Sequence, residues 1–376
     1  MENKPWVAMV RFVVVALFFD ALAPLLPYMA DGNAISVQQF QSLLGACYLV
    51  FALSQLASAS IIAVLGVYRA IALSSLSMSG VGLVMCLAED AMVFSSMFLT
   101  LFACNGVGAN ATRVALRTAS SEAGFKRLLA WITGAVEIKQ MAMPVVVAAI
   151  TAAFGWRWAL AALVLPVLLV GGWMQLMPRQ WPAAQANAVT SGWIKIASTR
   201  TFLMPTLIAA AFEIGFSPVS ARLPFILSTE LALSPLMTGL VLSCSSAAVA
   251  AGLLISGYLA TSRSSRSLIN LGLLLLCTGL CCTVAGTQFG WHYAVSGMIV
   301  MQTACGFIVI PCAADAINTV EVDRVRASAL FGFVQPVVCG LAVAFAALIP
   351  GSGTVVALLM MALSLCLMVL LLAYRQ

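Results

Sequence analysis

Long apolar runs separated by short polar intervals make up almost the whole chain. The first extends from Trp6 to Pro27 and reads WVAMVRFVVVALFFDALAPLLP. A helix that crosses a bilayer needs roughly 20 apolar residues, and each run is long enough to do so. The pattern predicts twelve spanning helices, over residues 6–27, 41–64, 69–88, 92–112, 128–153, 157–177, 202–222, 234–258, 268–286, 292–312, 327–349 and 354–373.

The longest polar interval lies near the midpoint of the chain. Residues 178–200 read PRQWPAAQANAVTSGWIKIASTR and separate six apolar runs from the next six. This layout is typical of two repeats that face each other across a central path. We therefore predict an all-α membrane protein with an N-terminal six-helix bundle (1–177), a linker (178–200) and a C-terminal six-helix bundle (201–376).

Composition agrees with this pattern and excludes a soluble protein. Hydrophobic residues make up 63% of the chain and charged residues 8%, whereas a soluble domain carries about 25% charged residues. The 11 cysteines fall inside apolar runs without a CxxC motif, which favours packing over disulfides or a metal site. The sequence contains no nucleotide-binding loop and no Ser/His/Asp pattern, so we expect neither a cofactor nor an enzyme.

The distribution of basic residues predicts the orientation. If the N-terminus is cytoplasmic, all of the 18 Lys and Arg residues except Lys139, Arg157 and Arg222 fall at inner helix ends or in inner loops. The positive-inside rule then places both termini in the cytoplasm of a bacterial-type inner membrane. The net charge of +6 reflects this topology, and we expect no nucleic-acid partner.

Charged residues within the apolar runs are the candidate functional groups. Asp20 lies well inside the first run, where a charged side chain costs about 2.5–3.5 kcal/mol on insertion scales. It is either a hydrogen-bonded structural acid or a proton or cation site, and we favour the proton site. Glu213, near the middle of the seventh run, and Glu137, in the fifth, are the next candidates for proton coupling.

The fifth and seventh apolar runs also contain charged residues, together with prolines in the seventh run. Glu137 and Lys139 are about 200° apart on a helix and cannot pair with each other, so each needs another partner. Prolines 205, 218 and 224 favour a breakable seventh helix of the kind that lines a pathway. Arg222 lies near the outer end of that helix.

Several short motifs resemble one transporter family. FFDALAPLLP in the first run, with Asp20, is similar to the first helix of the drug:proton antiporter branch of the major facilitator superfamily, particularly the bicyclomycin-resistance and chloramphenicol-efflux subgroup. QSLLGACYLVFALSQLA, with Tyr48 and Gln55, resembles its second helix. ATRVALRTAS, with Arg113 and Arg117, resembles its arginine-bearing segment, and LPFIL and RASALFGFVQ also fit. The resemblance implies twelve helices and alternating access.

The chain also departs from that family pattern. In the loop between the second and third helices, Gly66 is kept, but Ala63 stands where the family has Asp, and Arg69 is the single basic residue. In the fifth helix Pro144 is kept, but Lys139 and Met143 occupy positions that are glycine in antiporters. Small residues allow close helix packing, so these changes leave the direction of transport open.

On the fourth helix, Gly106, Asn110, Arg113 and Arg117 lie along one face. Gly106 allows a close backbone approach, Asn110 and Arg113 offer donors towards a cavity, and we interpret Arg117 as a cytoplasmic anchor. The complete set of predicted substrate-binding residues is Tyr48, Gln55, Asn110, Arg113, Lys139, Arg222 and Gln335.

These features predict a monomeric secondary transporter that works by alternating access. The resemblance favours proton-coupled efflux of drugs or metabolites. The intramembrane charges favour an alternative, a transporter and possibly an importer of carboxylate-type siderophores or other polar metabolites. A non-transporting receptor or scaffold is a third hypothesis, and it gives no reason to keep Asp20 and Glu213 at membrane depth.

Overall fold

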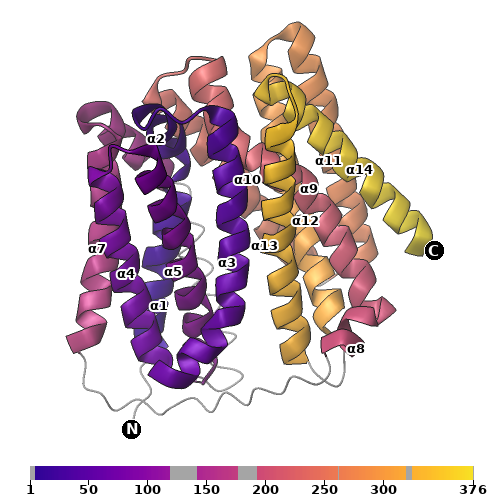
Figure 1. Cartoon of the computed structure of the whole chain (residues 1–376). Helices are drawn as coiled ribbons and strands as arrows, with labels where there is room; N and C mark the ends of the chain where they lie inside the picture. The colour runs from indigo at the N-terminus through magenta and orange to yellow at the C-terminus, as the bar shows by residue number, and fades with distance from the viewer. Residues whose placement is uncertain (1–4, 119–141, 177–192, 261, 319–323, 376) are drawn as a thin grey trace. The chain divides into compact units, whose positions relative to one another are not determined.

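The computed structural model describes residues 5–118, 142–176, 193–260, 262–318 and 324–375, and all regular structure within these ranges is helical (Figure 1). The N-terminal elements are α1 (Pro5–Asp20), η1 (Ala23–Leu25), α2 (Leu26–Gly32), α3 (Val37–Leu65), α4 (Val67–Leu87), α5 (Ala91–Thr118), a helix over Ala142–Phe154, and α7 (Trp156–Leu176). The later elements are α8 (Trp193–Ser198), α9 (Arg200–Phe225), η2 (Ile226–Glu230), α10 (Pro235–Leu259), α11 (Ser265–Phe289), α12 (Trp291–Asn318), α13 (Arg324–Leu348) and α14 (Gly353–Arg375).

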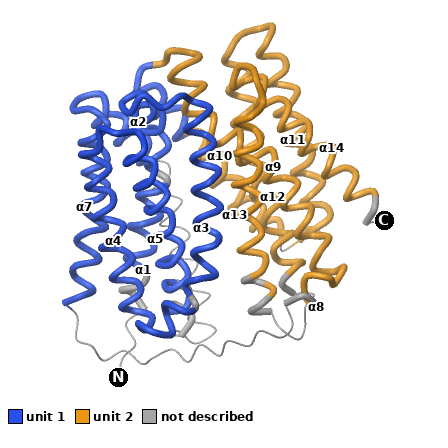
Figure 2. Tube along the Cα trace, in the orientation of Figure 1, with its two compact units in different colours: residues 1–189, 234–243 blue, residues 190–233, 244–376 orange. Residues whose placement is uncertain are grey.

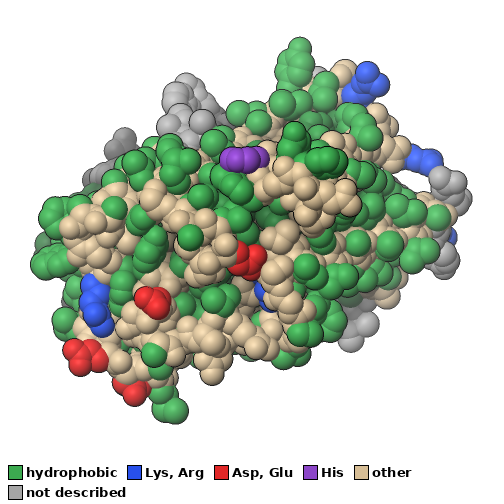
Figure 3. Space-filling view, turned by 90° about the horizontal axis from the view of Figure 1, so that it is seen from above, with side chains coloured by type: hydrophobic (Ala, Val, Ile, Leu, Met, Phe, Trp, Pro, Cys, Tyr) green, Lys and Arg blue, Asp and Glu red, His purple; other side chains and the backbone are tan. Residues whose placement is uncertain are grey.

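The prediction of an all-α membrane protein with twelve helices is confirmed. Within the described residues, 11 helical stretches are long and apolar enough to span a bilayer, and Ala142–Phe154 is a shorter apolar helix. Together they correspond to the twelve predicted segments. Helices span membranes because they satisfy their backbone hydrogen bonds internally. Figure 3, which views the molecule from above, shows hydrophobic side chains spread over this end together with other side chains and backbone, and charged side chains at separate places.

The first apolar run differs from its prediction as one continuous helix. α1 ends at Asp20, a 3₁₀ turn follows over Ala23–Leu25, and α2 then continues the run to Gly32. Pro24 and Pro27 explain the interruption, since proline has no N–H to donate to the preceding turn. Asp20 therefore occupies the last position of α1, where the regular helix stops.

Local signals define the ends of α3. The Ser36 Oγ accepts a hydrogen bond from the Gln39 N–H at 3.2 Å, and the Gln39 Oε1 accepts one from the Ser36 N–H at 3.0 Å. This reciprocal pair is a capping box. At the other end, Gly66 separates α3 from α4 with φ 78° and ψ 157°, a backbone conformation essentially restricted to glycine. The retained glycine of this loop thus has a structural cause.

The described helices form two compact units, which are coloured separately in Figure 2. In the first unit (1–189 and 234–243), α5 packs against α1, α3 and α4, and α4 packs against α7. In the second unit (190–233 and 244–376), α9 packs against α12, α13 and α14, and α11 packs against α12. The two six-helix bundles bounded by residues 178–200 remain a prediction.

The first turns of α10 are grouped with the first unit, and Gly239 shows why. A Cβ at this position would lie 2.6 Å from the Ala148 Cβ and 2.7 Å from the Pro144 carbonyl oxygen. α10 therefore approaches the helix over Ala142–Phe154 closely at Gly239, next to the backbone of Pro144. Small residues on either partner allow such contacts.

Substitution of Gly66 by Ala tests the backbone constraint between α3 and α4. A Cβ at Gly66 meets no atom within 4 Å, so any loss comes from the backbone conformation alone. We expect G66A to lower the free energy of unfolding by about 1–3 kcal/mol. The measurement is the thermal unfolding midpoint in detergent.

Gly80 provides the matched control. It lies within α4, and a Cβ there also meets nothing within 4 Å. Because its backbone is helical, G80A should leave the midpoint unchanged or raise it slightly. Equal midpoints for the two variants would contradict the assignment of a glycine-restricted turn at Gly66.

Candidate functional site

The central element of the second unit is α9. It carries Glu213, Ser220 and Arg222, which contact neighbouring helices. In its most apolar 18-residue window 78% of the residues are buried, against 33–56% for the other candidate spans. The helix continues without a break through prolines 205, 218 and 224 and then widens into the π-helical turn η2. The expected breakable helix is thus regular as far as Phe225.

Glu213 lies near the middle of α9 in a cluster of neutral side chains. Its side chain is 8% exposed. The Ser217 Oγ donates to the Glu213 Oε2 at 2.7 Å, and the Cys339 Sγ of α13 donates to the same oxygen at 3.2 Å. The Ser217 Oγ and Cys339 Sγ are themselves 3.0 Å apart. No lysine or arginine of the described ranges forms an ion pair with this carboxyl group.

These three side chains, which we call the acid cluster (Glu213, Ser217 and Cys339), can be hydrogen-bonded in both charge states of the acid. When the carboxyl group is ionised, it accepts from the hydroxyl and the thiol. When it is protonated, its O–H can donate to the Ser217 Oγ, and the Ser217 hydrogen then turns to the Cys339 Sγ. A hydroxyl has one hydrogen and two lone pairs, so either arrangement satisfies Ser217.

Aromatic and polar groups adjoin the acid cluster on α9. The rings of Phe212 and Phe216 stack with centroids 5.3 Å apart. One face of the helix continues through Ser220, whose Oγ accepts from the Gln302 Nε2 of α12 at 3.0 Å. A Cβ at Gly215 would lie 2.7 Å from the Ser364 Cβ of α14, so a glycine is required for close contact there.

Gln335, a predicted substrate-binding residue on α13, has a buried side-chain amide without hydrogen-bond partners in the described part of the chain. This holds for both its Nε2 and its Oε1. Buried amide groups are normally satisfied, so an orphaned pair requires an explanation such as a ligand or water. The adjacent Pro336 lies within α13.

Arg222 and Glu230 hold the turn between α13 and α14. The Arg222 Nη2 donates to the Ala346 carbonyl oxygen at 2.6 Å, near the C-terminal end of α13. Pro350, four residues after Ala346, has no N–H to offer that carbonyl. Glu230 accepts from the Gly353 N–H at the start of α14. Each charge thus lies at the helix end whose dipole it complements.

In the first unit, two of the predicted residues contact neighbouring helices. The Asn110 Nδ2 donates to the Ser58 Oγ of α3 at 2.6 Å. The Tyr48 ring makes an edge contact with Phe102, with centroids 5.9 Å apart. Gln55 lies on α3 and is half-buried, and its backbone carbonyl oxygen accepts from the Ser58 Oγ at 2.6 Å.

The close backbone approach predicted at Gly106 is present on α5, the fourth predicted spanning helix. A Cβ there would lie 2.6 Å from the Phe51 carbonyl oxygen and would overlap the Ser54 Oγ, so the two backbones approach closely. The remaining predictions fall beyond what the structure describes, namely the side chains of Asp20, Arg113 and Arg117, and all of Glu137 and Lys139.

Sequence reasoning missed three residues of these environments. Arg11 was assigned to an inner helix end, but its side chain is 1% exposed, and a Cβ at Gly108 would overlap its Nη2. Its position inside the first apolar run was the available signal. Ser217, four residues after Glu213, could be found from helical spacing. Cys339 carried no signal, because it is 126 residues from Glu213.

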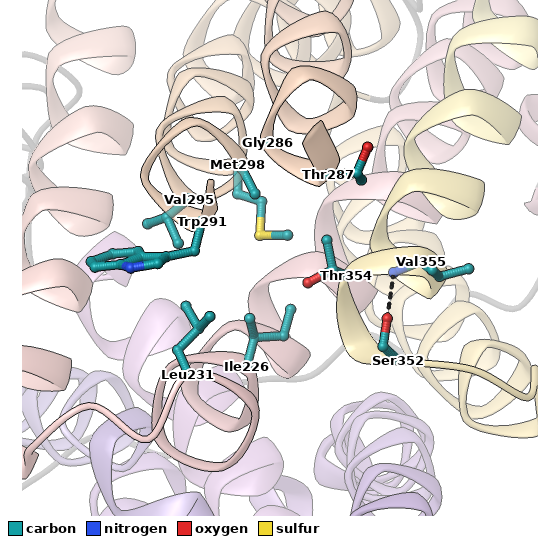
Figure 4. A pocket seen from close by; sticks show the side chains of 11 residues that line it. Ile226, Leu231, Gly286, Thr287, Trp291, Val295, Met298, Ser352, Thr354 and Val355 are labelled. Atoms are coloured by element: carbon teal, nitrogen blue, oxygen red, sulfur yellow. Dashed lines mark hydrogen bonds between the residues drawn. The ribbon is translucent and has the colours of Figure 1, made fainter. Parts of the chain in front are cut away.

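A separate pocket of about 260 Å³ lies in the second unit beside η2, where α11 ends and α12 and α14 begin (Figure 4). Ile226 and Leu231 form one side, the first turns of α12 another, and the start of α14 the third. In the close-up view the side chains of Met298 and Thr354 extend towards its middle. None of its lining residues is charged.

The geometry is that of a multi-pass membrane protein with acids and amides inside its helical units. A search of curated proteins gives no match. Among solved structures, the chain is similar to a bacterial homolog of the human lysosomal transporter Spinster in an inward-facing, occupied conformation (TM-score 0.78, 13% identity, 98% of this chain and 95% of that one). The nucleoside transporter NupG has TM-score 0.78 and 14% identity, over 98% and 99% of the two chains. A POT family transporter in complex with 5-aminolevulinic acid has TM-score 0.83 and 9% identity, over 100% and 96%.

The family model of the Major Facilitator Superfamily matches residues 9–347, and the chain belongs to this family. The structural neighbours, at these identities, share the fold. Family and fold are those of transporters, and they imply a small-molecule substrate and a lipid bilayer. The general prediction of a major facilitator transporter is confirmed, whereas the drug:proton antiporter branch remains a prediction.

Substitution of Arg222 by Met distinguishes its predicted role in substrate binding from its contact with α13. Met keeps the apolar stem but cannot donate to the Ala346 carbonyl oxygen. The Ala346 carbonyl oxygen keeps the Ile349 N–H as a donor at 3.2 Å. A hydrogen bond from a charged group contributes about 1.5–3 kcal/mol, so we expect its loss in R222M to lower the thermal unfolding midpoint in detergent with no substrate present. An unchanged midpoint together with weaker substrate binding would favour the role in substrate recognition.

Proposed function

We propose that this protein is a proton-coupled secondary transporter that exports drugs or hydrophobic metabolites by alternating access. The observation that carries the proposal is the acid cluster on α9. A carboxyl group in an apolar span is costly when ionised and unpaired. Glu213 has neutral partners that suit both of its charge states, whereas a permanently ionised acid is usually paired with a cation. Glu213 therefore acts as a site that takes up and releases a proton.

Asp20 and Glu137 remain in the proposal as additional proton-coupling acids. Asp20 ends α1, and a 3₁₀ turn begins three residues later at Ala23, where the regular helix is interrupted. An interruption at membrane depth is typical of transporter sites, because irregular backbone there lines a cavity or is buried in protein. This supports a role for the region around Asp20 in the transport path.

Gln335 supports a substrate site with neutral polar contacts. Its buried amide oxygen and nitrogen lack partners, so a cargo that offers one acceptor and one donor would satisfy both. Asn110, Tyr48 and Gln55 are further candidates for such contacts. These residues suit a largely apolar cargo that carries one or two polar groups.

The alternative is transport of carboxylate-type siderophores or other polar metabolites, possibly by import. It depends on basic residues that recognise the anionic cargo, with Arg113, Lys139 and Arg222 as the candidates. Arg222, the one whose side chain is described, donates from its Nη2 to the Ala346 carbonyl oxygen, and its buried Nε has no hydrogen-bond partner in the described part of the chain. Because the family resemblance and the neutral partners of Glu213 both favour proton-coupled efflux, efflux is our first choice, with the protein in a bacterial-type inner membrane and both termini cytoplasmic.

Transport by the purified protein in proteoliposomes with an imposed pH gradient tests proton coupling. The cargo panel contains cationic drugs, neutral hydrophobic compounds, carboxylate siderophores and small carboxylates. We expect E213Q to abolish gradient-driven accumulation while keeping exchange of cargo at equal concentrations, since Gln imitates the protonated acid but cannot release a proton. D20N is tested beside it, and movement of cargo opposite to protons identifies efflux.

Glu230→Gln is the matched control. Glu230 follows α9 in the same segment, and the Gln carbonyl can still accept from the Gly353 N–H. E230Q should retain gradient-driven accumulation. If E213Q accumulates cargo as the native protein does, Glu213 is a structural acid and the coupling role passes to Asp20 or Glu137. If no member of the panel responds to the gradient in the native protein, the proton-coupled assignment is wrong.

A further inference from the structure

The pocket at the helix ends of the second unit is remote from the acid cluster. Ile226, in its wall, follows Glu213 by 13 residues in the chain, which corresponds to roughly 20 Å along a helix at 1.5 Å per residue. None of the acid-cluster residues lines the pocket. Whatever binds there does not need the proton site.

The lining combines apolar walls with a small set of hydroxyl groups. Ile226, Leu231, Val295 and Met298 provide apolar surface, and the Trp291 indole closes one side (Figure 4). The Ser352 Oγ accepts from the Val355 N–H at 3.3 Å, which leaves its own hydrogen available. Ligand sites in proteins are typically of this kind, mostly apolar with a few oriented polar groups.

Other hydroxyls of the pocket have already used their hydrogens. The Thr287 Oγ1 donates to the Val284 carbonyl oxygen at 2.7 Å, and the Thr354 Oγ1 contacts the Glu230 Oε2 at 3.4 Å. Their oxygens retain lone pairs that can accept. The pocket therefore offers one donor, on Ser352, and acceptors on the two threonines, which together match an alcohol group on a ligand.

The electrostatics of the pocket argue against an anionic ligand. The N-terminus of α14 would otherwise attract a negative charge. Glu230 already occupies this position, because its carboxylate accepts from the Gly353 N–H. A Cβ at Gly353 would lie 2.6 Å from the Glu230 Oε1, so the glycine is needed for this contact. With the helix end neutralised and no charged lining residue, the pocket suits an uncharged molecule.

The surroundings place the pocket where amphipathic molecules concentrate. Phe289 and Tyr293, at the adjoining ends of α11 and α12, are exposed and make an edge contact with ring centroids 6.2 Å apart. Aromatic residues at the ends of spanning helices are typical of the membrane–water interface. The volume of about 260 Å³ lies just below the range of about 300–1,000 Å³ for drug-sized ligands.

We propose that this pocket binds a small uncharged amphipathic molecule, with its apolar body between η2 and α12 and its hydroxyl group at Ser352 and Thr354. Two sources carry this chemistry, a free medium-chain alcohol and the hydroxyl-bearing end of a neutral acylglycerol in the bilayer. The site is independent of the proposed proton coupling, because it rests on the cavity and its lining alone.

Photoaffinity labelling of the full-length protein in phosphatidylcholine nanodiscs tests the proposal. One arm uses a diazirine derivative of octanol and the other a diazirine monoacylglycerol, and labelled residues are mapped by peptide mass spectrometry. We expect saturable labelling within residues 286–298 or 352–355. The arm that gives this labelling identifies the source of the ligand, and excess unlabelled octanol or monoacylglycerol should reduce the labelling about tenfold, as expected when a competitor is present at about ten times its own Kd.

Two variants and one control make the result specific. V295F fills the pocket from a buried position, and T287F covers it from an exposed one, so that the second remains informative if the first does not fold. Both should abolish the saturable labelling. V284F adds the same ring on α11 at an exposed position that does not line the pocket, and it should label as the native protein does.

The proposal is overturned by labelling that spreads over exposed helix faces without saturation, or by saturable labelling that survives in both V295F and T287F. Thermal unfolding of each variant confirms that the protein is folded. Gradient-driven transport, measured on proteoliposomes of the same variants, reports separately on the acid cluster, so a failure of one proposal does not imply a failure of the other.

Discussion

Polar and charged groups inside an apolar span must find their partners within the protein, and α9 is where this constraint acts most strongly. The helix and its extension carry two acids, Glu213 and Glu230, and two arginines, Arg200 at the first position and Arg222 in the last turn. Arg222 donates to a carbonyl at the end of α13, and Glu230 accepts from an N–H at the start of α14. Both partners are backbone groups at helix ends, which keep one fixed polarity.

Glu213 satisfies the same constraint in a different way. Its partners are a hydroxyl and a thiol, and the hydroxyl can reverse its role from donor to acceptor. The two outer charges therefore stabilise the connection between α13 and α14, while the inner acid can change its charge without losing its hydrogen bonds. This contrast underlies our assignment of proton coupling to Glu213, and it explains why Glu230 is a suitable control.

The family assignment gives these observations their context. The match to the Major Facilitator Superfamily extends over residues 9–347, whereas the solved transporters with the same fold share 9–14% of their residues with this chain. At that distance, substrates do not carry over from one member to another. The chemistry of this chain's own buried groups, chiefly the acid cluster and the orphaned amide of Gln335, is therefore the better guide to cargo and coupling.

The sequence predicts the spanning helices well because a bilayer imposes one length and one composition on each of them. The close approach at Gly106 was predicted from the helix face that it shares with Asn110. Gly66 was noted only as a glycine kept from the family pattern, and its unusual backbone angles come from the structure. Pro24 and Pro27 indicate the interruption after Asp20, but the continuous apolar run by itself predicts one helix. Contacts between helices were out of reach, because nothing in the spacing of the chain connects Cys339 to Glu213.

Arg222 also shows that contacts between helices cannot be predicted from the sequence. As a cation near the end of a spanning helix, it suggested recognition of an anionic cargo. The structure supplies a partner for its Nη2, the Ala346 carbonyl oxygen, which also accepts from the Ile349 N–H. The buried Nε of Arg222 has no partner among the described residues, so its predicted role in recognising a cargo stays a prediction. A charge in an apolar segment marks a position that needs a partner, but only the tertiary structure identifies whether that partner is a ligand or the protein itself.

The most direct test of the account is the charge state of Glu213 itself, measured by infrared difference spectroscopy of the reconstituted protein during a pH titration. We predict a carboxylic-acid C=O band that titrates, is absent from E213Q, and changes frequency in C339A but much less in C339S, because Ser keeps a donor at this position. A spectrum in which E213Q removes no titrating band, or in which C339A leaves that band unchanged, would contradict a proton site built from Glu213, Ser217 and Cys339.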